Sequence, residues 1–311
     1  MKKAVIDIGS NSVKFLVCEK LSDNNVKTIL DTNEIARLGE GLQKEGRITP
    51  SAMSRNVDAV KSFYERAAAL GCDEIKAVGT MALRQAENRG EFIEKVRAAC
   101  GLKVEVIPGE EEARLSYLGV LSALPLKDEE VTAFDTGGGS TEFIFGKGER
   151  LENRISINLG ANRIRETYLL SDPPKKEEIE NAGEAVKREL QAAGIKKHGS
   201  LLVGIGGTVT TMASVKAKME VYDADKIQGS ILTKEDIEEE MNLCASMTLE
   251  ERRHITGLNP KRAEVVTAGA LIVDTIIKEL GVSSLLVSDR GLRHGLMYLL
   301  FAKNIHKKDT V

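Results

Sequence analysis

Two glycine-rich segments of nearly the same sequence occur in the two halves of this chain, and their repetition constrains the fold more than any other feature. In each, an apolar run ends at an aspartate, small residues make a tight turn, and a second apolar run follows, as in a β-hairpin. Small residues let a bound group approach the backbone, and successive N–H groups in such a turn form an anion-binding concavity. The repetition predicts a duplicated fold with two phosphate-binding turns, Asp7-Ile8-Gly9-Ser10-Asn11-Ser12 and Asp135-Thr136-Gly137-Gly138-Gly139-Ser140-Thr141.

Composition bounds what such a duplicated chain can be. Its 311 residues suit two domains, and contents of 42% hydrophobic and 29% charged residues are those of a soluble globular protein. A net charge of −3 and only 4% aromatic residues disfavour nucleic acid as a partner. No apolar run reaches the length of a membrane span, so we expect no signal peptide, no membrane association and a cytoplasmic location. The four cysteines lack paired spacing, and we expect reduced thiols.

The hydrophobic periodicity repeats in the same order as the two turns. The first half predicts strands at 3–9, 12–20, 26–37, 74–79 and 103–107, with helices at 50–70, 89–100 and 110–124. The second predicts strands at 131–135, 140–146, 150–158, 200–205 and 284–288, with helices at 160–169, 175–193, 207–218, 233–246, 260–280 and 291–305.

Three meandering strands followed by crossovers predict a mixed sheet with helices on its faces. We therefore expect an α/β protein of two duplicated actin-like domains, of the ribonuclease H-like type shared by sugar kinases, Hsp70 and actin, with an interdomain cleft. Domain I is expected at 1–125 plus the C-terminal helix at about 291–311, and domain II at 126–290.

Acidic residues beside the second turn point to a metal. Asp135 ends a strand at the turn, and Mg²⁺ needs only one or two carboxylates because it keeps its waters. Glu142 follows the second turn where Lys14 follows the first. This exchange of acid for base suggests that one turn holds charge while the other positions water or metal.

Three further segments have both a plain and a functional interpretation. Gly206-Gly207-Thr208 opens a helix whose N–H groups favour an anion, with Thr208 as a cap, or it is an ordinary capped helix. Glu110-Glu111-Glu112 starts another helix, where acids complement the dipole, but three in a row exceed that need and one can accept a proton from water. Arg84 follows a strand end and can fork onto phosphate, although the segment alone favours a solvated arginine.

These segments, in this order, resemble the exopolyphosphatase and guanosine pentaphosphate phosphohydrolase family, whose longer members carry an additional C-terminal helical region. The matching stretches span nearly the whole chain: Asp7 to Ser12, Gly109 to Arg114, Asp135 to Glu142, Leu159-Gly160-Ala161, Gly206-Gly207-Thr208, Arg262 to Ala270 and Gly291-Leu292-Arg293. Departures from the family pattern are Met81 in place of a serine, Asn162 in place of an aliphatic residue and Glu264 in place of an aspartate.

The resemblance implies roles for individual residues. Glu112 matches the catalytic carboxylate, Asp135 the metal-linked aspartate, and Glu142 the acid that closes the second turn and is shared between catalysis and metal. The implied cofactor is Mg²⁺, with Mn²⁺ as an alternative, and a homodimer is implied. The implied phosphate-binding residues are Gly9, Ser10, Asn11, Ser12, Arg84, Gly137, Gly138, Gly139, Ser140, Thr141, Gly207 and Thr208.

The expected function is an exophosphatase that removes the terminal phosphate of inorganic polyphosphate, of guanosine pentaphosphate, or of both. Two alternatives stay open on the residues. One is an ATP-dependent small-molecule kinase of the same superfamily, which needs an acceptor. The other is a non-catalytic polyphosphate or alarmone sensor, which would bind without turnover.

Overall fold

The computed structural model describes residues 1–21, 25–124, 128–148, 150–196, 199 and 201–302. The chain divides into two compact units, residues 1–122 with 292–311 and residues 123–291, and each is described by itself. The expected boundary at residues 125 and 126 and the expected helix end at 305 lie outside the described residues. Across the described parts, no helix is both long and apolar enough to cross a membrane.

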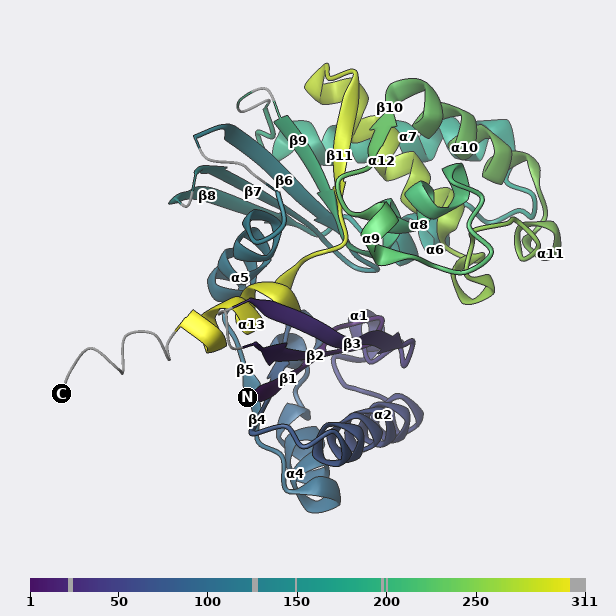
Figure 1. Ribbon diagram of the computed structural model, residues 1–311. Helices are drawn as coiled ribbons and strands as arrows, with labels where there is room; N and C mark the ends of the chain where they lie inside the picture. Colours follow the sequence, from purple (N-terminus) through teal and green to yellow (C-terminus); the bar gives the residue numbers. More distant parts are fainter. Residues whose placement is uncertain (22–24, 125–127, 149, 197–198, 200, 303–311) are drawn as a thin grey trace. The chain divides into compact units, whose positions relative to one another are not determined.

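The first unit is a five-stranded mixed sheet with helices, in the strand order β3-β2-β1-β4-β5 (Figure 1). The first three strands form the expected antiparallel meander, and β4 and β5 add in parallel beside β1. Its elements are β1 (Lys2–Ile8), β2 (Val13–Lys20), β3 (Val26–Glu34), α1 (Leu42–Glu45), α2 (Pro50–Ala69), β4 (Glu74–Gly79), α3 (Met81–Gln85), α4 (Arg89–Cys100), β5 (Val104–Val106), α5 (Gly109–Leu121) and α13 (Leu292–Ala302).

Helix α2 shows how local sequence sets an element in this unit. The Thr49 hydroxyl accepts a hydrogen bond from the Ala52 amide, Pro50 occupies the first turn, and the chain leaves the helix at Gly71, whose φ is 70°. One face of α2 is buried against the sheet, where Phe63 stacks on Phe15 of β2 with ring centroids 4.8 Å apart. The expected start and end of this helix are confirmed.

The second unit repeats the plan around a six-stranded sheet in the order β10-β11-β9-β6-β7-β8. Without the edge strand β10, this order matches that of the first sheet strand for strand, which confirms the duplication. Its elements are β6 (Glu130–Thr136), β7 (Thr141–Lys147), β8 (Arg150–Ile157), α6 (Ala161–Tyr168), α7 (Lys176–Ala192), β9 (Leu201–Ile205), α8 (Gly206–Lys216), α9 (Ala224–Ile227), β10 (Ile231–Thr233), α10 (Lys234–Ser246), α11 (Leu249–Arg252), α12 (Val266–Leu280) and β11 (Ser284–Ser288).

The structure departs from the sequence expectation mainly in short elements. Helices α1, α3, α9 and α11 have four or five residues each, and β10 has three, too few to show a hydrophobic period. The helix expected over 260–280 is wrong at its start, because residues 260–262 form a separate 3-10 turn and α12 begins at Val266. Pro260 accounts for the break, since it favours the first turn of a new element.

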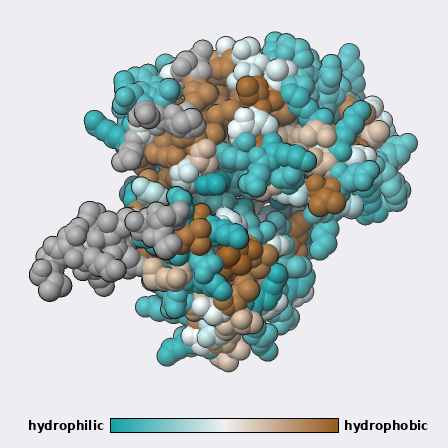
Figure 2. All heavy atoms as spheres, in the orientation of Figure 1, coloured by the Kyte–Doolittle hydropathy of each residue, from teal (hydrophilic) through white to brown (hydrophobic). Residues whose placement is uncertain are grey.

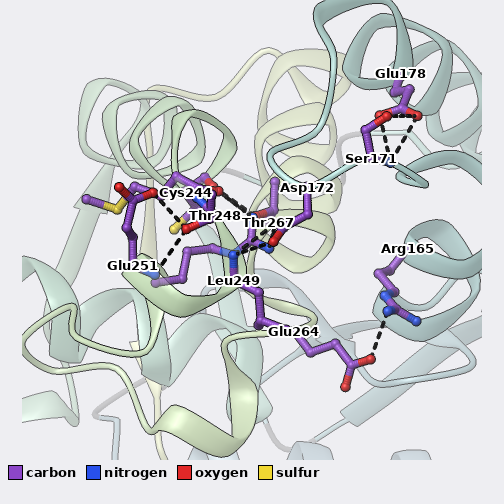
Figure 3. Close-up of polar contacts among 12 residues, drawn as sticks. Arg165, Ser171, Asp172, Glu178, Cys244, Thr248, Leu249, Glu251, Glu264 and Thr267 are labelled. Carbon is purple, nitrogen blue, oxygen red and sulfur yellow. Dashed lines mark hydrogen bonds and ion pairs between the residues drawn. The ribbon is translucent and has the colours of Figure 1, made fainter.

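Polar contacts within the second unit hold its longer loops in place (Figure 3). The Asp172 carboxylate accepts the Leu249 amide at the start of α11 and the Arg252 guanidinium at 3.0 Å. Arg165 of α6 pairs with Glu264, which precedes α12, at 2.9 Å.

All four cysteines are free thiols, as expected. On the face shown in Figure 2, hydrophilic and hydrophobic residues are interspersed.

Candidate functional site

The two glycine-rich turns are closed by the same hydrogen bond. The Gly9 amide donates to the Ser12 carbonyl at 3.0 Å, and the Gly137 amide donates to the Ser140 carbonyl at 2.9 Å. Each turn joins the first two strands of its sheet, as the sequence predicted. The repeat in sequence is therefore also a repeat in backbone geometry.

A segment that follows the third strand anchors each turn in an equivalent way. In the first unit, the Gly39 amide donates to the Ser10 carbonyl at 2.8 Å. In the second, the Asn162 amide at the start of α6 donates to the Gly138 carbonyl, also at 2.8 Å. A turn whose carbonyls are bound from behind has fewer conformations to lose when an anion binds to its amides.

Charged residues flank the two turns in different combinations. Asp7 lies opposite Lys14 across β1 and β2, with Oδ2 and Nζ 3.6 Å apart. At the matching place in the second unit, Asp135 lies opposite Glu142 across β6 and β7, and Glu142 Oε1 accepts the Ser156 hydroxyl of β8 at 3.1 Å. The position that holds a lysine beside the first turn thus holds a second carboxylate beside the second turn.

The Asp135–Glu142 pair fits a divalent cation. Like charges directly opposite each other on neighbouring strands repel, and a bound cation would relieve that repulsion. Carboxylate oxygens are the ligands that Mg²⁺ prefers, and it needs only one or two of them. Among the described residues, no group of three or more His, Cys, Asp and Glu side chains forms a metal cluster.

The third glycine turn, between β9 and α8, brings charge close to the backbone. Gly206 has a φ of 80°, and a Cβ built there would lie 2.1 Å from Asp135 Oδ1. A Cβ on Gly207 would lie 2.2 Å from an Arg262 nitrogen. The positive φ of Gly206 favours glycine there, and at both positions the end of a charged side chain, a carboxylate or a guanidinium, lies where a Cβ would be.

Thr208 does not cap α8, so that expectation is wrong. The helix begins at Gly206, and its cap residue is Ile205. The Thr208 hydroxyl instead donates to the Thr136 carbonyl at 2.9 Å, which ties the third turn to the end of β6. Gly207 and Thr208 thus lie beside the second turn, where β9 runs parallel to β6.

Arg262 is a residue of this site that the sequence did not single out, because it was named only within a matching stretch. It lies in the 3-10 turn before α12, 55 positions after Gly207 by residue number, and its guanidinium rests against the start of α8. Burial lowers the pKa of Arg262, while the nearby Tyr222 and Asp135 act in the opposite direction. The Arg262 guanidinium thus brings positive charge close to Asp135.

In the first unit, Arg84 and Glu112 are brought together. Arg84 lies on α3 after β4, Glu112 lies in the first turn of α5 after β5, and these strands are parallel neighbours. The Arg84 guanidinium donates to Glu112 Oε2 at 2.6 Å and to the Ile107 carbonyl at 3.1 Å. Arg84 is therefore not the solvated arginine that its own segment favoured.

The first turn lies near the same α3. The Thr80 amide before this helix donates to the Ile8 carbonyl at 3.2 Å, and the Ser10 hydroxyl contacts the Met81 sulfur at 4.0 Å. Met81, the departure from the family's serine, thus contacts the turn itself. The first unit places a phosphate-type turn, an arginine and a paired glutamate along the carboxyl ends of neighbouring strands, where ligands of α/β sheets bind.

The three acids at the start of α5 have different surroundings. Glu111 binds Arg114 of the same helix through two hydrogen bonds of 2.8 Å, whereas Glu112 binds Arg84 on another element. Both carboxylates are half-buried. The contact between Glu112 and Arg84 links the start of α5 to α3, which follows β4, the strand next to β1.

Three hydroxyl residues at the two turns are buried. Ser12 and Ser140 are buried, and the buried Thr141 hydroxyl donates to the Leu159 carbonyl at 2.6 Å. Thr141 therefore holds the second turn from behind. The backbone of the turn is more open, and Gly137 is its exposed residue.

Comparison with known proteins gives consistent likenesses over the whole chain. The Ppx/GppA phosphatase family matches residues 16–304. Exopolyphosphatase 2 of Mycobacterium tuberculosis is 31% identical over 308 residues, which cover 94% of this chain and 96% of that protein. A bifunctional 3-dehydroquinate synthase/phosphatase of Fusobacterium nucleatum is 35% identical over 92% of this chain, which spans 45% of that longer protein.

Solved structures agree with these likenesses. The Aquifex aeolicus member of the Ppx/GppA family is 34% identical, with a TM-score of 0.84 over 99% of this chain and 98% of that one. An exopolyphosphatase from Cytophaga hutchinsonii is 26% identical, with a TM-score of 0.88 over 97% and 98%. The α/β class and the actin-like two-domain fold expected from the repeat are confirmed.

Proposed function

The chain belongs to the Ppx/GppA phosphatase family, and we propose that it is an exophosphatase, a hydrolase of phosphoanhydride bonds. Its proposed substrates are inorganic polyphosphate and guanosine pentaphosphate, from which it removes the terminal phosphate. This chain matches two proteins named exopolyphosphatase over nearly their full length, which supports this proposal. The site supports it independently, because its glycine turns suit phosphate and its carboxylates suit proton transfer and a cation.

One observation carries the proposal, namely the pairing of Glu112 with Arg84 at 2.6 Å beside the first glycine turn. Phosphoryl transfer needs positioning and electrostatic stabilisation more than covalent chemistry from the protein. A glutamate held by an arginine has a defined orientation, and an arginine can bind phosphate oxygens through its remaining N–H groups.

The proposed reaction uses these residues in a definite order. Glu112 accepts a proton from a water molecule, and the water oxygen forms a bond to the terminal phosphorus as the bridging P–O bond breaks. The shortened chain leaves with the electron pair of that bond, and inorganic phosphate is the second product. Arg84 orients the Glu112 carboxylate, and the amides of the first glycine turn, in the same unit, bind phosphate oxygens.

Asp135 and Glu142 would hold Mg²⁺, or Mn²⁺ in its place, which when bound offsets negative charge on the phosphate oxygens. The pairing of these carboxylates across β6 and β7 supports this assignment. Glu142 would in addition fix the geometry of the second turn, since the Ser156 hydroxyl holds its Oε1.

Phosphate release tests the proposal directly. We expect the purified protein with Mg²⁺ to release inorganic phosphate from short polyphosphate, long polyphosphate and guanosine pentaphosphate without any acceptor. Release that needs ATP and an added acceptor would support the kinase alternative. Tight binding of the same compounds with no release would support the sensor alternative, and either result would overturn the proposal.

We also propose a cytoplasmic homodimer, which family membership supports. Light scattering on the purified protein measures the mass in solution. A mass near 33.8 kDa, that of one chain, would contradict the dimer.

A further inference from the structure

Helix α13 packs directly on the backbone of α5, the helix that carries Glu112 (Figure 1). A Cβ built on Gly295 of α13 would lie 1.9 Å from the Leu115 carbonyl oxygen and 3.0 Å from the Gly119 amide nitrogen. In an α-helix the amide of residue i+4 donates to the carbonyl of residue i, so these two atoms are the ends of one hydrogen bond of α5. Gly295 therefore lies against a backbone hydrogen bond, and a side chain there would collide with it.

This contact lies about one helical turn from Glu112. Leu115 follows Glu112 by three residues, which is about 4.5 Å along the helix axis. The Leu115 side chain is buried in a small core that includes Leu292 of α13 and Ile107, which precedes α5. The Ile107 carbonyl and the Glu112 carboxylate both accept hydrogen bonds from Arg84, at 3.1 Å and 2.6 Å. The packing of α13 is thus continuous with the contacts of Glu112.

Both ends of α13 are held to the sheet of the first unit. Near its start, the Arg293 guanidinium donates to the two carboxylate oxygens of Asp31 of β3, at 2.8 Å and 3.0 Å. Near its end, the Leu300 carbonyl accepts a hydrogen bond of 2.8 Å from Lys3 of β1, whose side chain is 4% exposed and also pairs with Glu74. Charge-assisted hydrogen bonds are stronger than neutral ones. We therefore expect a clash between the two helices to displace α5 rather than α13.

We propose that Gly295 is a positioning residue for Glu112. Its lack of a side chain lets α13 approach the backbone of α5, and this approach sets the place of the Glu112 carboxylate relative to Arg84 and the first glycine turn. Gly295 is buried, so it acts through the position of α5 and not through contact with substrate. The proposal rests on the proposed function, since it assigns Gly295 to the same reaction.

Gly295→Ala tests the proposal by adding a single methyl group. The Cβ and the Leu115 oxygen would have to separate from 1.9 Å to about 3.3 Å, an ordinary contact distance between carbon and a carbonyl oxygen, which is a shift of about 1.4 Å. A misplacement of about 1 Å can lower an enzymatic rate about 10²-fold. We expect kcat for polyphosphate to fall by about that factor. The Kd of tripolyphosphate, measured by calorimetry in a Glu112→Gln background, should change by less than about twofold, because the first glycine turn joins β1 and β2 and is not part of α5.

The same substitution at Gly90 is the matched control. Gly90 lies in α4 of the same unit, and a Cβ built there meets no atom within 4 Å. Alanine favours a helix more than glycine does at either position, so the two variants share that effect and differ in the clash. We expect wild-type kcat and Kd in Gly90→Ala.

A double-mutant cycle separates positioning of Glu112 from a general loss of structure. If Gly295→Ala acts through Glu112, it should lower kcat little once Glu112 is replaced by Gln, so the two losses are not additive. A merely structural defect would lower the residual rate of Glu112→Gln by the same factor as it lowers the rate of the intact protein. Additive losses, an unchanged kcat in Gly295→Ala, or an equal loss in Gly90→Ala would each overturn the proposal.

A crystal structure of Gly295→Ala gives a readout that does not depend on activity. We expect the 2.6 Å contact between Arg84 and Glu112 to lengthen or break, and an unchanged contact would contradict the role of Gly295. If the intact protein releases no phosphate, the proposed function fails, while this structure still decides the role of Gly295. If Gly295→Ala does not fold, Leu292→Ala serves in its place, because it removes packing from the same small core beside α5. It should lower kcat with the same dependence on Glu112, and additive losses there would count equally against the proposal.

Discussion

Replacing Glu112 with Gln is the most direct test of the proposed chemistry. The amide keeps the size of the side chain and an oxygen that can accept the Arg84 hydrogen bond, but it cannot accept a proton from water. A positioned general base contributes about 10²–10⁴-fold to a rate, which corresponds to about 3–5 kcal/mol in the barrier. We expect kcat for polyphosphate to fall by that factor while tripolyphosphate still binds.

The structure bounds the competing effect on stability. The Arg84 and Glu112 side chains are 27% and 23% exposed, so their ion pair is partly screened. Such a pair is worth about 1 kcal/mol, and a negative charge in the first turn of a helix about 0.3–1 kcal/mol. The loss of stability in Glu112→Gln is therefore smaller than the expected rise in the barrier, and the two effects can be told apart by thermal denaturation and initial rates.

Glu111→Gln is the matched control because it lies in the same turn of α5. It loses the same helix-end charge and the ion pair with Arg114, whose two side chains are 38% and 43% exposed. We expect wild-type kcat in this variant. Near-normal turnover in Glu112→Gln, or an equal loss in Glu111→Gln, would remove Glu112 from the mechanism and leave both residues as charges that complement the helix dipole.

Three further predictions concern the cation and two titrating groups. Asp135→Asn should raise the Mg²⁺ concentration needed for half-maximal phosphate release, because one of two paired carboxylates is lost; full activity of the wild type in excess chelator would refute the cation's role. Although burial opposes it, hydrogen bonds from His294 and Arg293 lower the pKa of Asp31 from 3.8 to about 2. This contributes about 2 kcal/mol of stability above pH 4 that is lost as pH falls from 4 toward 2, so urea unfolding of Asp31→Asn should show a smaller loss over that range than wild type. Burial, reinforced by Asp236, raises the pKa of Glu240 from 4.5 to about 9. The folded state then binds a proton that the unfolded state releases, so wild-type stability should fall as pH rises from 5 to 9, and a Glu240→Gln variant whose unfolding keeps the same pH slope would contradict this.

The duplicated fold was predictable because its signals are local and repeated. Tight turns need small residues, and strands that bury both faces need apolar runs, so two copies of one pattern indicated two copies of one sheet. The ends of α2 followed from Thr49, Pro50 and Gly71 for the same reason. The short elements escaped because three to five residues carry too little periodicity to identify.

The candidate site was predictable only as a set of residues. The turns, Asp135, Glu142 and Glu112 were named from the sequence, and the pairing of Asp135 with Glu142 across a hairpin follows from turn length alone. Arg84, by contrast, looked like a surface residue in its own segment. Its partner Glu112 is distant in sequence, and only the parallel pairing of β4 with β5 brings their helices together.

The amino-acid sequence by itself thus determined the repeat, the order of the strands along the chain and the positions of the small residues, since each depends on neighbours along the chain. Tertiary structure alone decided what packs against those small residues. Asp135 fills the space beside Gly206, Arg262 fills that beside Gly207, and Arg37 is fixed in a left-handed conformation against the first turn. These contacts depend on which strands lie side by side and on how closely the segments that follow those strands approach one another. Neither is a property of any one segment.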